Sequence, residues 1–268
     1  MIKLGIVGCG SIGTIVAEAV KKNYSSVYKL ICLSDKISDR AKELAEKSGP
    51  GIRLAGIDEL VKECDLVLEA AAPDIAPYIL GRCIANGKDA MIMSSGGLID
   101  RADLFEAARE KGIRVFIPSG AVSGIDAVKA ARIAGIDEIV LTTKKPPEGL
   151  LGAPYIKENG IDLDSVKEET VIFDGTARDA MKNFPNNINV SATLSICGVG
   201  ADKTRVRIVV VPGSKANSHQ LTLKARSGIV RTVTENLPMP GNPKTSYLAA
   251  VSAVACLEGI VSSVRAGT

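Results

Sequence analysis

The chain has 268 residues, of which 46% are hydrophobic and 24% charged, and its formal net charge is +3. This length allows one large domain or two ordinary ones, with enough residues to bury a core. The net charge is small, the basic residues are scattered, and aromatic residues make up only 3%. The composition therefore favours a globular protein and argues against a nucleic-acid-binding surface.

The six cysteines lie far apart and form no C-x-x-C pair, a distribution typical of neither a zinc site nor a disulfide framework. We interpret them as reduced thiols, which indicates a reducing compartment. A strand-like run starts at Ile2, so we expect no signal peptide. The apolar stretch 247–264 is rich in alanine and serine and is interrupted by Glu258, which favours a buried helix over a membrane span. We expect a cytoplasmic protein without membrane contact and without a metal site.

The first 117 residues alternate between strand-like and helical patterns. Apolar runs occupy residues 2–7, 29–34, 52–54, 66–69, 89–93 and 113–117. Helical patterns occupy residues 11–22, 39–47, 57–62, 73–86 and 101–110. Continuous apolar strands separated by amphipathic helices predict a doubly wound parallel α/β sheet of the Rossmann type. We assign this dinucleotide-binding domain to residues 1–120.

After residue 120 strand candidates follow one another with few helices between them, at 138–143, 169–173, 203–211, 220–226 and 229–235. This pattern predicts an α+β second domain with a largely antiparallel sheet, residues 121–243, for substrate binding, catalysis and dimerisation. The proline-rich residues 238–243 are interpreted as a rigid connector. They precede a last helix, 245–264 within residues 244–268, which we expect to pack back on the first domain or to join a subunit interface.

The first strand is followed directly by a G-x-G-x-x-G motif, from Gly8 through Gly10 to Gly13. Gly8 allows the tight turn, Gly10 lets the backbone approach a diphosphate, and Gly13 lets the helix pack closely on the strand. Ser11 and Ile12 complete the motif at the helix N-terminus, which favours bound anions. We predict that all five residues bind a dinucleotide, the alternative being a glycine-rich turn without a ligand.

Asp35 ends the second strand, about 20 residues beyond the motif, where a Rossmann domain carries its ribose-binding acid. A carboxylate at this position favours NAD over NADP. However, Lys36 is adjacent and Arg40 lies one helical turn further on, and either could accommodate a 2′-phosphate. NAD and NADP both remain open, as does an ordinary loop or capping role for Asp35.

Two later strand ends carry small residues, at 70–73 and at 94–97. Ligands of open α/β sheets lie across the carboxyl ends of the strands, so we expect both segments to border the cofactor, with Ala71 among its contacts. His219 is the only histidine, and its side chain suits proton exchange near neutral pH. Taken alone, a single histidine is more often a structural residue than a catalytic one.

Six blocks of this sequence resemble the L-aspartate dehydrogenases of archaea and bacteria. They are residues 8–13, 93–97, 117–121, 142–147, 184–190 and 242–246. The resemblance implies NAD(P)-dependent oxidation of L-aspartate to iminoaspartate, the reverse reductive amination of oxaloacetate, a possible supply of iminoaspartate to NAD biosynthesis, and a homodimer. It also implies that His219 is the catalytic residue and that Ala121 and Asn189 contact the nicotinamide cofactor.

Two points stay open in the sequence. The substrate carboxylates need cationic or hydrogen-bonding partners, and the candidates on or near the second-domain strands are Arg205, Arg207, Lys215 and Lys224. Residues 144–145 are interpreted as a solvated strand end. The alternative functions are a related Rossmann dehydrogenase of the homoserine or dihydrodipicolinate type, and a regulator that senses NAD(H) without catalysis.

Overall fold

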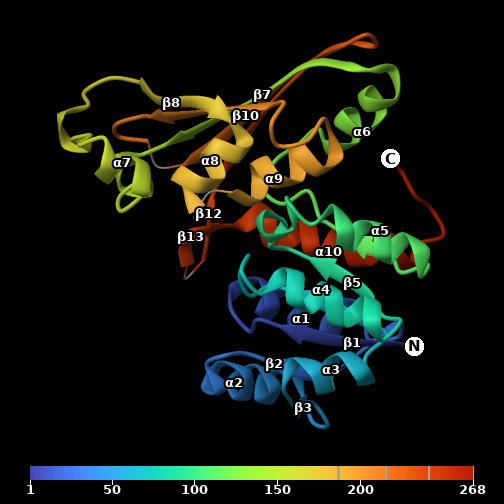
Figure 1. Ribbon diagram of the computed structural model, residues 1–268. Helices are drawn as coiled ribbons and strands as arrows, with labels where there is room; N and C mark the ends of the chain where they lie inside the picture. Colours follow the sequence, from blue (N-terminus) through green and yellow to red (C-terminus); the bar gives the residue numbers. More distant parts are fainter. Residues whose placement is uncertain (186–187, 215, 241, 268) are drawn as a thin grey trace. The chain divides into compact units, whose positions relative to one another are not determined.

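The computed structural model describes residues 1–185, 188–214, 216–240 and 242–267. The chain forms two compact units (Figure 1). The first comprises Met1–Gly120 together with Ala249–Arg265, and the second is formed mainly by Ala121–Leu248. Each unit has its own sheet.

The sheet of the first unit is parallel throughout, with the strand order β3-β2-β1-β4-β5-β6. Its strands are β1 (Ile2–Val7), β2 (Tyr28–Ser34), β3 (Arg53–Leu54), β4 (Leu66–Glu69), β5 (Asp89–Ile92) and β6 (Val115–Phe116). The order reverses between β1 and β4, which creates the switch point where such sheets bind ligands. The predicted doubly wound sheet is confirmed.

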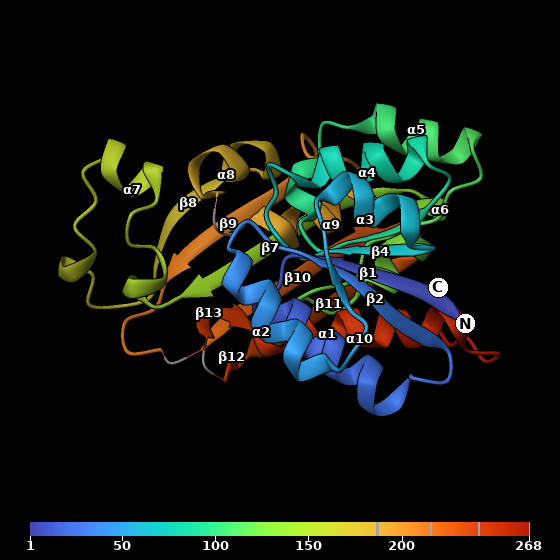
Figure 2. The same ribbon diagram turned by 90° about the horizontal axis from the view of Figure 1, so that it is seen from below.

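Helices cover both faces of this sheet. They are α1 (Ser11–Asn23), α2 (Ser38–Ser48), α3 (Ile57–Glu63), α4 (Ala76–Ala85), the 3₁₀ helix η1 (Ser95–Leu98) and α5 (Ala102–Glu110). Helices α3 and α4 lie on one face, and α1, α2 and α10 (Tyr247–Val261) lie on the other (Figure 2). Both faces being buried explains why the strands are apolar without alternation.

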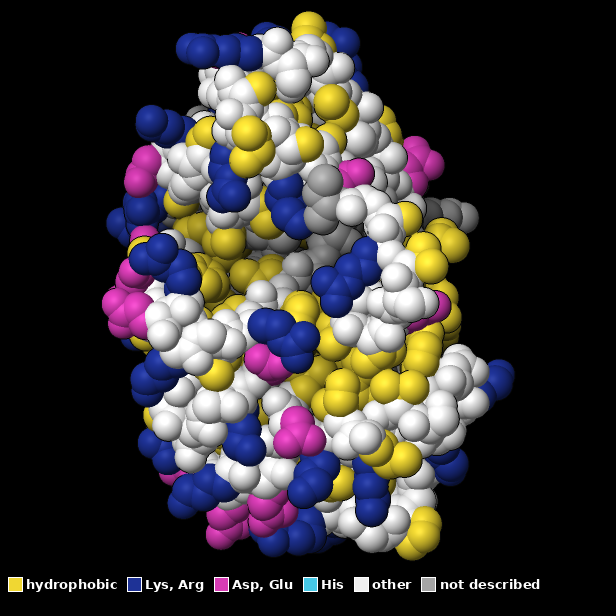
Figure 3. Space-filling model, turned by 90° about the vertical axis from the view of Figure 1, so that its right-hand side faces the viewer, with side chains coloured by type: hydrophobic (Ala, Val, Ile, Leu, Met, Phe, Trp, Pro, Cys, Tyr) yellow, Lys and Arg dark blue, Asp and Glu magenta, His cyan; other side chains and the backbone are white. Residues whose placement is uncertain are grey.

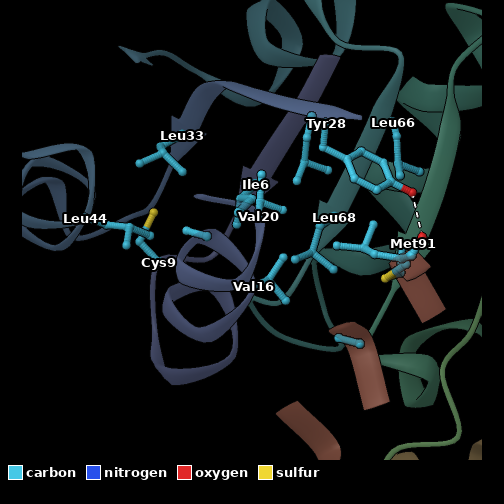
Figure 4. Packing of buried hydrophobic residues seen from close by; sticks show 14 of the residues in the cluster. Ile6, Cys9, Val16, Val20, Tyr28, Leu33, Leu44, Leu66, Leu68 and Met91 are labelled. Carbon is cyan, nitrogen blue, oxygen red and sulfur yellow. Dashed lines mark hydrogen bonds between the residues drawn. The ribbon is translucent and has the colours of Figure 1, made fainter. Parts of the chain in front are cut away.

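Helix α10 packs against the first sheet although it comes at the end of the chain. Ala253 and Leu257 are fully buried in the cluster formed by α1, α2 and the central strands, part of which is drawn in Figure 4. The hydroxyl of Tyr28 donates a hydrogen bond of 2.7 Å to the carbonyl oxygen of Leu257. This bond allows the tyrosine to be buried without an unsatisfied hydroxyl and fixes the helix on the sheet.

The sheet of the second unit has the order β11-β10-β7-β9-β8. Its strands are β7 (Ile136–Lys145), β8 (Thr170–Thr176), β9 (Thr204–Val210), β10 (Asn217–Ala225) and β11 (Gly228–Asn236). Neighbours pair antiparallel except β7 and β9, which are parallel. The prediction of a largely antiparallel sheet is confirmed, with one parallel pair that the sequence analysis did not anticipate.

The helices of the second unit were not predicted. The three longest are α6 (Ile125–Ala134), α8 (Ala177–Asn183) and α9 (Ile188–Cys197). They pack on one face of the five-stranded sheet. The side chains of β7 that point to this face, such as Ile139, Leu141 and Thr143, are buried between the helices and the sheet. The remaining short helices are η2 (Pro147–Gly149), α7 (Pro154–Glu158) and η3 (Leu163–Ser165). Helix α9 was not predicted because its serines and threonines are mixed with its apolar residues, so the apolar residues form no stripe along one side of the helix.

The prediction that residues 238–243 form a rigid connector was wrong in part. Strand β12 (Pro238–Met239) pairs antiparallel with β13 (Asn242–Ser246), so this segment forms a short hairpin that leads into α10. Gly241 lies outside the described residues. Prolines are tolerated here because a two-stranded ribbon has only edge strands.

Charged side chains of both signs are dispersed over one face of the molecule. On the face shown in Figure 3, lysines and arginines are interspersed with acidic and uncharged side chains. Within the described residues, no helix is both long and apolar enough to cross a bilayer. The six cysteines are all free thiols.

Candidate functional site

The glycine motif lies in the turn between β1 and α1, and two of its glycines are required by the protein itself. Gly8 has a φ of +99°, and a Cβ atom on it would lie 2.4 Å from the carbonyl oxygen of Ala70. A Cβ atom on Gly13 would lie 2.1 Å from the carbonyl oxygen of Gly8. Both positions therefore exclude a side chain because backbone would occupy the same space.

Gly10 differs from these two. Its φ of −77° is open to any residue, and a Cβ atom on it would meet no described atom within 4 Å. The packing of the chain thus gives no reason for glycine at this position. Gly10 is the N-cap of α1 and provides no side-chain cap, so the helix N-terminus with Ser11 and Ile12 stays accessible to an anion. This open space fits the close approach of a diphosphate.

Asp35 links the end of β2 to the same turn. Its carboxylate accepts hydrogen bonds from the backbone N–H of Cys9 (2.7 Å) and of Ile37 (2.8 Å). Two carboxylate oxygens offer about four acceptor positions, so capacity remains for ribose hydroxyl groups. Lys36 and Arg40 are exposed beside it, as an NADP-binding alternative requires.

Glu69, at the end of β4, also lies at this edge of the sheet and was not predicted as a site residue. Its side chain is fully buried. One carboxylate oxygen accepts from the N–H groups of Ala71 (2.8 Å) and Ala72 (3.1 Å) and from the hydroxyl of Ser94 (2.8 Å). The other accepts from the Ser94 N–H (2.9 Å). An acidic residue closing an apolar strand was the signal that could have revealed it.

The four hydrogen bonds join the two small-residue segments predicted to border the cofactor. Burial raises the pKa of Glu69, and the bonds from Ser94, Ala71 and Ala72 oppose that rise because they stabilise the carboxylate. A Cβ atom on Gly97 would lie 1.9 Å from the carbonyl oxygen of Pro73, so the two loops also touch directly. Ala71 itself is exposed at this edge.

His219 lies in β10 of the second unit, and its ring is buried. It pairs across the sheet with Thr143 of β7, and the threonine Oγ1 and histidine Nδ1 are hydrogen-bonded at 3.0 Å. Burial, helped by the positive charge of Lys145, lowers the pKa of His219 to about 4. The imidazole is therefore neutral at physiological pH, which is the form that can accept a proton.

Ala121 is held at the same end of the five-stranded sheet as His219. Its carbonyl oxygen accepts a 2.9 Å hydrogen bond from the side-chain amide of Asn236 in β11. Two residues on, the Ser123 N–H donates to Thr234 Oγ1 (3.2 Å), and Thr234 pairs directly with His219. Asn189 lies in the first turn of α9, which packs on β9 of this sheet.

Three of the four candidate carboxylate-binding residues do not share the face of His219. Arg205 and Arg207 both pair with Asp174, at 2.6 Å and 2.9 Å, and Lys224 pairs with Glu138. Strand alternation directs all three to the face of the sheet opposite His219, so the structure does not support these candidates for holding a carboxylate beside that residue. Lys215 lies outside the described residues.

Among the described residues of the five strands, Lys145 is the basic one that alternation places on the face of His219. The interpretation of residues 144–145 as a solvated strand end holds only for Lys144, which pairs with Glu169 at 2.6 Å. Lys145 is half-buried, and burial lowers its pKa to about 8. Among the described residues, no group of three or more His, Cys, Asp or Glu is arranged to hold a metal ion.

In the comparison with known proteins, the two parts of the chain match two different family models. Residues 8–118 match the model of the NAD-binding domain of homoserine dehydrogenase, and residues 126–260 match that of the C-terminal domain of aspartate dehydrogenase. The L-aspartate dehydrogenase of Methanosarcina acetivorans is 42% identical, and that of Methanocaldococcus jannaschii is 40% identical, each over the full length of both chains. The chain belongs to the L-aspartate dehydrogenase family.

Solved structures agree with this assignment. The aspartate dehydrogenase of Thermotoga maritima superposes with a TM-score of 0.78 at 27% identity, with full coverage of both chains. A homoserine dehydrogenase of Thiobacillus denitrificans reaches a TM-score of 0.61 at 15% identity, covering 96% of this chain and 72% of that one, which shows a shared fold only. This family member is an NAD(P)-dependent oxidoreductase with an amino-terminal Rossmann domain.

Substitution of Gly10 tests the cofactor site. Because the space beside Gly10 is empty of protein, Gly10→Ala should fold normally but weaken NAD⁺ binding by roughly tenfold or more, equivalent to about 1.4 kcal/mol. Titration calorimetry measures the affinity, and thermal unfolding checks the fold. Gly56→Ala is the control, since Gly56 also has a negative φ and open space for a Cβ atom. Unchanged NAD⁺ affinity in Gly10→Ala would contradict the site.

The pH dependence of the reaction tests the state of His219. A free histidine titrates near 6.5, whereas burial lowers the pKa of His219 to about 4. The neutral base is then already present well below pH 6.5, and kcat/KM for the substrate should show no ionisation near that pH, because kcat/KM reports the free enzyme. The control is the pH profile of cofactor affinity. A fall of kcat/KM at low pH with an apparent pKa near 6.5, without a matching fall in cofactor affinity, would contradict a buried neutral histidine.

Proposed function

We propose that this chain oxidises L-aspartate to iminoaspartate with NAD⁺ or NADP⁺, and catalyses the reverse reductive amination of oxaloacetate. The observation that carries the proposal is the buried, neutral His219, held by Thr143 in the part of the chain that matches the aspartate dehydrogenase model. A base of this kind is what amine oxidation requires, because a proton must leave the nitrogen while a hydride leaves the α-carbon.

The residues of the second unit would handle that proton. When Nδ1 of His219 carries the hydrogen and donates it to Thr143 Oγ1, the lone pair of Nε2 is available to accept the proton of the substrate ammonium group. In the reductive direction the same nitrogen returns a proton to the amine. Thr143 thus holds the orientation of the ring, and its hydroxyl oxygen can accept the Nδ1 hydrogen of this tautomer.

The residues of the first unit would hold the cofactor, whose nicotinamide accepts the hydride. The N-terminus of α1 beside Gly10 would bind the diphosphate, and Asp35 the ribose hydroxyl groups. Asp35 favours NAD, and Lys36 with Arg40 supplies the positive charge for the phosphate of NADP. Ala71 of the first unit, and Ala121 and Asn189 of the second, remain proposed cofactor contacts.

The first alternative is a related dehydrogenase of the homoserine or dihydrodipicolinate type. The homoserine dehydrogenase model matches only residues 8–118, the part to which we assign the cofactor and not the substrate. The second alternative, a regulator that senses NAD(H) without catalysis, leaves the buried His219–Thr143 pair without a role. Both alternatives are less well supported than aspartate oxidation.

The cellular setting is also a proposal. Six free thiols suit a reducing compartment such as the cytoplasm. Iminoaspartate released there would enter pyridine-nucleotide synthesis or hydrolyse to oxaloacetate. The resemblance to the family suggests the first fate.

An assay with L-aspartate tests the proposed activity. Purified protein should reduce NAD⁺ or NADP⁺ with L-aspartate and not with L-homoserine, and the two cofactors should be compared separately. His219→Ala should lower kcat by roughly 10²–10⁴-fold, the usual contribution of a general base, and should leave cofactor affinity nearly unchanged. Turnover with homoserine alone would support the first alternative, and cofactor binding without any turnover would support the second.

We further propose that the chain forms a homodimer through the second sheet. The face opposite His219 carries exposed apolar side chains, among them Val171 of β8 and Ile229 and Val233 of β11, which are 56%, 58% and 62% exposed. Exposed apolar side chains on both outer strands of this face, β8 and β11, favour its burial against a second copy of the chain.

Light scattering after size exclusion tests the dimer. The wild type should have twice the chain mass of 28.0 kDa, and Val233→Glu should be monomeric because the charge would be buried at the interface. Ile133→Glu is the control, since Ile133 is equally apolar and exposed on α6, which covers the other face. A dimer that survives Val233→Glu would exclude this face as the interface.

A further inference from the structure

We propose that the ε-ammonium group of Lys145 binds a carboxylate of the amino-acid substrate and thereby gives the site its preference for an acidic amino acid. This inference rests on the function proposed above. It follows from the position of Lys145 in the sheet, from the chemistry of its neighbours and from the position of the other basic candidates on the opposite face.

The position is set by strand register. Thr143 and Lys145 are two residues apart in β7, so their side chains leave the same face of the sheet. His219 is the direct partner of Thr143, which makes Lys145 its diagonal neighbour, a separation of about 7–8 Å that a long side chain spans. Lys145 pairs on its other side with Val210 of β9, so the lysine rises from the middle of the sheet and not from an edge.

The surroundings favour an anion at this point. Burial lowers the pKa of Lys145 to about 8, and the charge of Lys145 in turn contributes to the low pKa of His219. A substrate carboxylate beside the lysine would stabilise its charged form and relieve the unfavourable field at the histidine. The substrate would thus bring the charge that the site needs in order to accept a proton.

The chemistry of L-aspartate matches this arrangement. Its amine must reach His219, and each of its two carboxylates is within three bonds of the carbon that bears the amine. A cation one diagonal away from the base can therefore hold a carboxylate while the amine meets the imidazole. Arg205, Arg207 and Lys224 are directed to the opposite face of the sheet, so Lys145 replaces them in this role.

Kinetics of Lys145→Met test the inference. Loss of a charge-assisted bond should raise KM for L-aspartate by about tenfold or more while KM for NAD⁺ stays within a factor of about three. Lys145→Arg should retain most of the affinity. Lys144→Met is the matched control, because its side chain lies on the other face and pairs with Glu169, and it should behave as the wild type. Thermal unfolding confirms that each variant is folded.

Two substrates distinguish the carboxylates. If Lys145 binds the side-chain carboxylate, Lys145→Met should lose the preference for L-aspartate over L-asparagine. If it binds the α-carboxylate, both substrates should weaken equally, and the part of the inference that assigns the preference for an acidic amino acid to Lys145 would be wrong. An unchanged KM for L-aspartate in Lys145→Met, or an equal loss in Lys144→Met, would overturn the inference.

Binding of succinate separates this inference from the proposed function. Succinate carries two carboxylates and no amine, so its affinity for the NAD⁺-loaded protein reports carboxylate binding without catalysis. We expect titration calorimetry to show binding to the wild type and a loss of about tenfold or more in Lys145→Met. If the wild type fails to oxidise L-aspartate but keeps this difference, the proposed function is wrong and the carboxylate site stands. Equal succinate affinity in both proteins would refute the site.

Discussion

The carboxylate of Glu69 organises the edge of the first sheet at which a Rossmann domain binds its cofactor. It accepts four hydrogen bonds, from Ala71, from Ala72 and twice from Ser94, and thereby closes the loops that follow β4 and β5. A buried carboxylate is costly unless such donors surround it. The same edge depends on the close approach of Gly8 to Ala70. The loops around the switch point are thus held by contacts within the protein, and the space beside Gly10 is left for the ligand.

Because side chains alternate along each strand, the second sheet has one buried face with the candidate site residues and one exposed face with ion pairs. The face covered by α6, α8 and α9 carries Thr143 and His219, both buried, while the opposite face carries the ion pairs of Arg205 and Lys224. Exposed pairs of this kind contribute little to stability. Burial on the other face matters more for the site, because it lowers the pKa of His219 and so keeps the imidazole neutral and able to accept a proton.

Local patterns were sufficient to predict the first unit. The strand at Ile2–Val7 and the glycine motif depend on neighbouring residues, and the structure has them where the sequence indicated. Contacts between distant residues were beyond such patterns. Glu69 acquires its donors from Ser94, 25 residues away, and the difference between Lys144 and Lys145 appears only once the register of β7 and β10 is known. Periodicity also failed for α9, whose polar and apolar residues follow no helical stripe.

Register also connects the electrostatics of the two buried bases. Burial is the main reason why the pKa of His219 lies near 4 and the reason why that of Lys145 lies near 8, and the positive charge of Lys145 adds to the fall at His219. With such a low pKa the histidine is a weak acceptor in the absence of substrate. A dicarboxylic amino acid would add negative charge at the face where the repulsion exists, and would raise the proton affinity of the histidine as it binds. A substrate with an uncharged side chain would add less, so the preference for an acidic amino acid and the strength of the base would follow from the same electrostatic interaction.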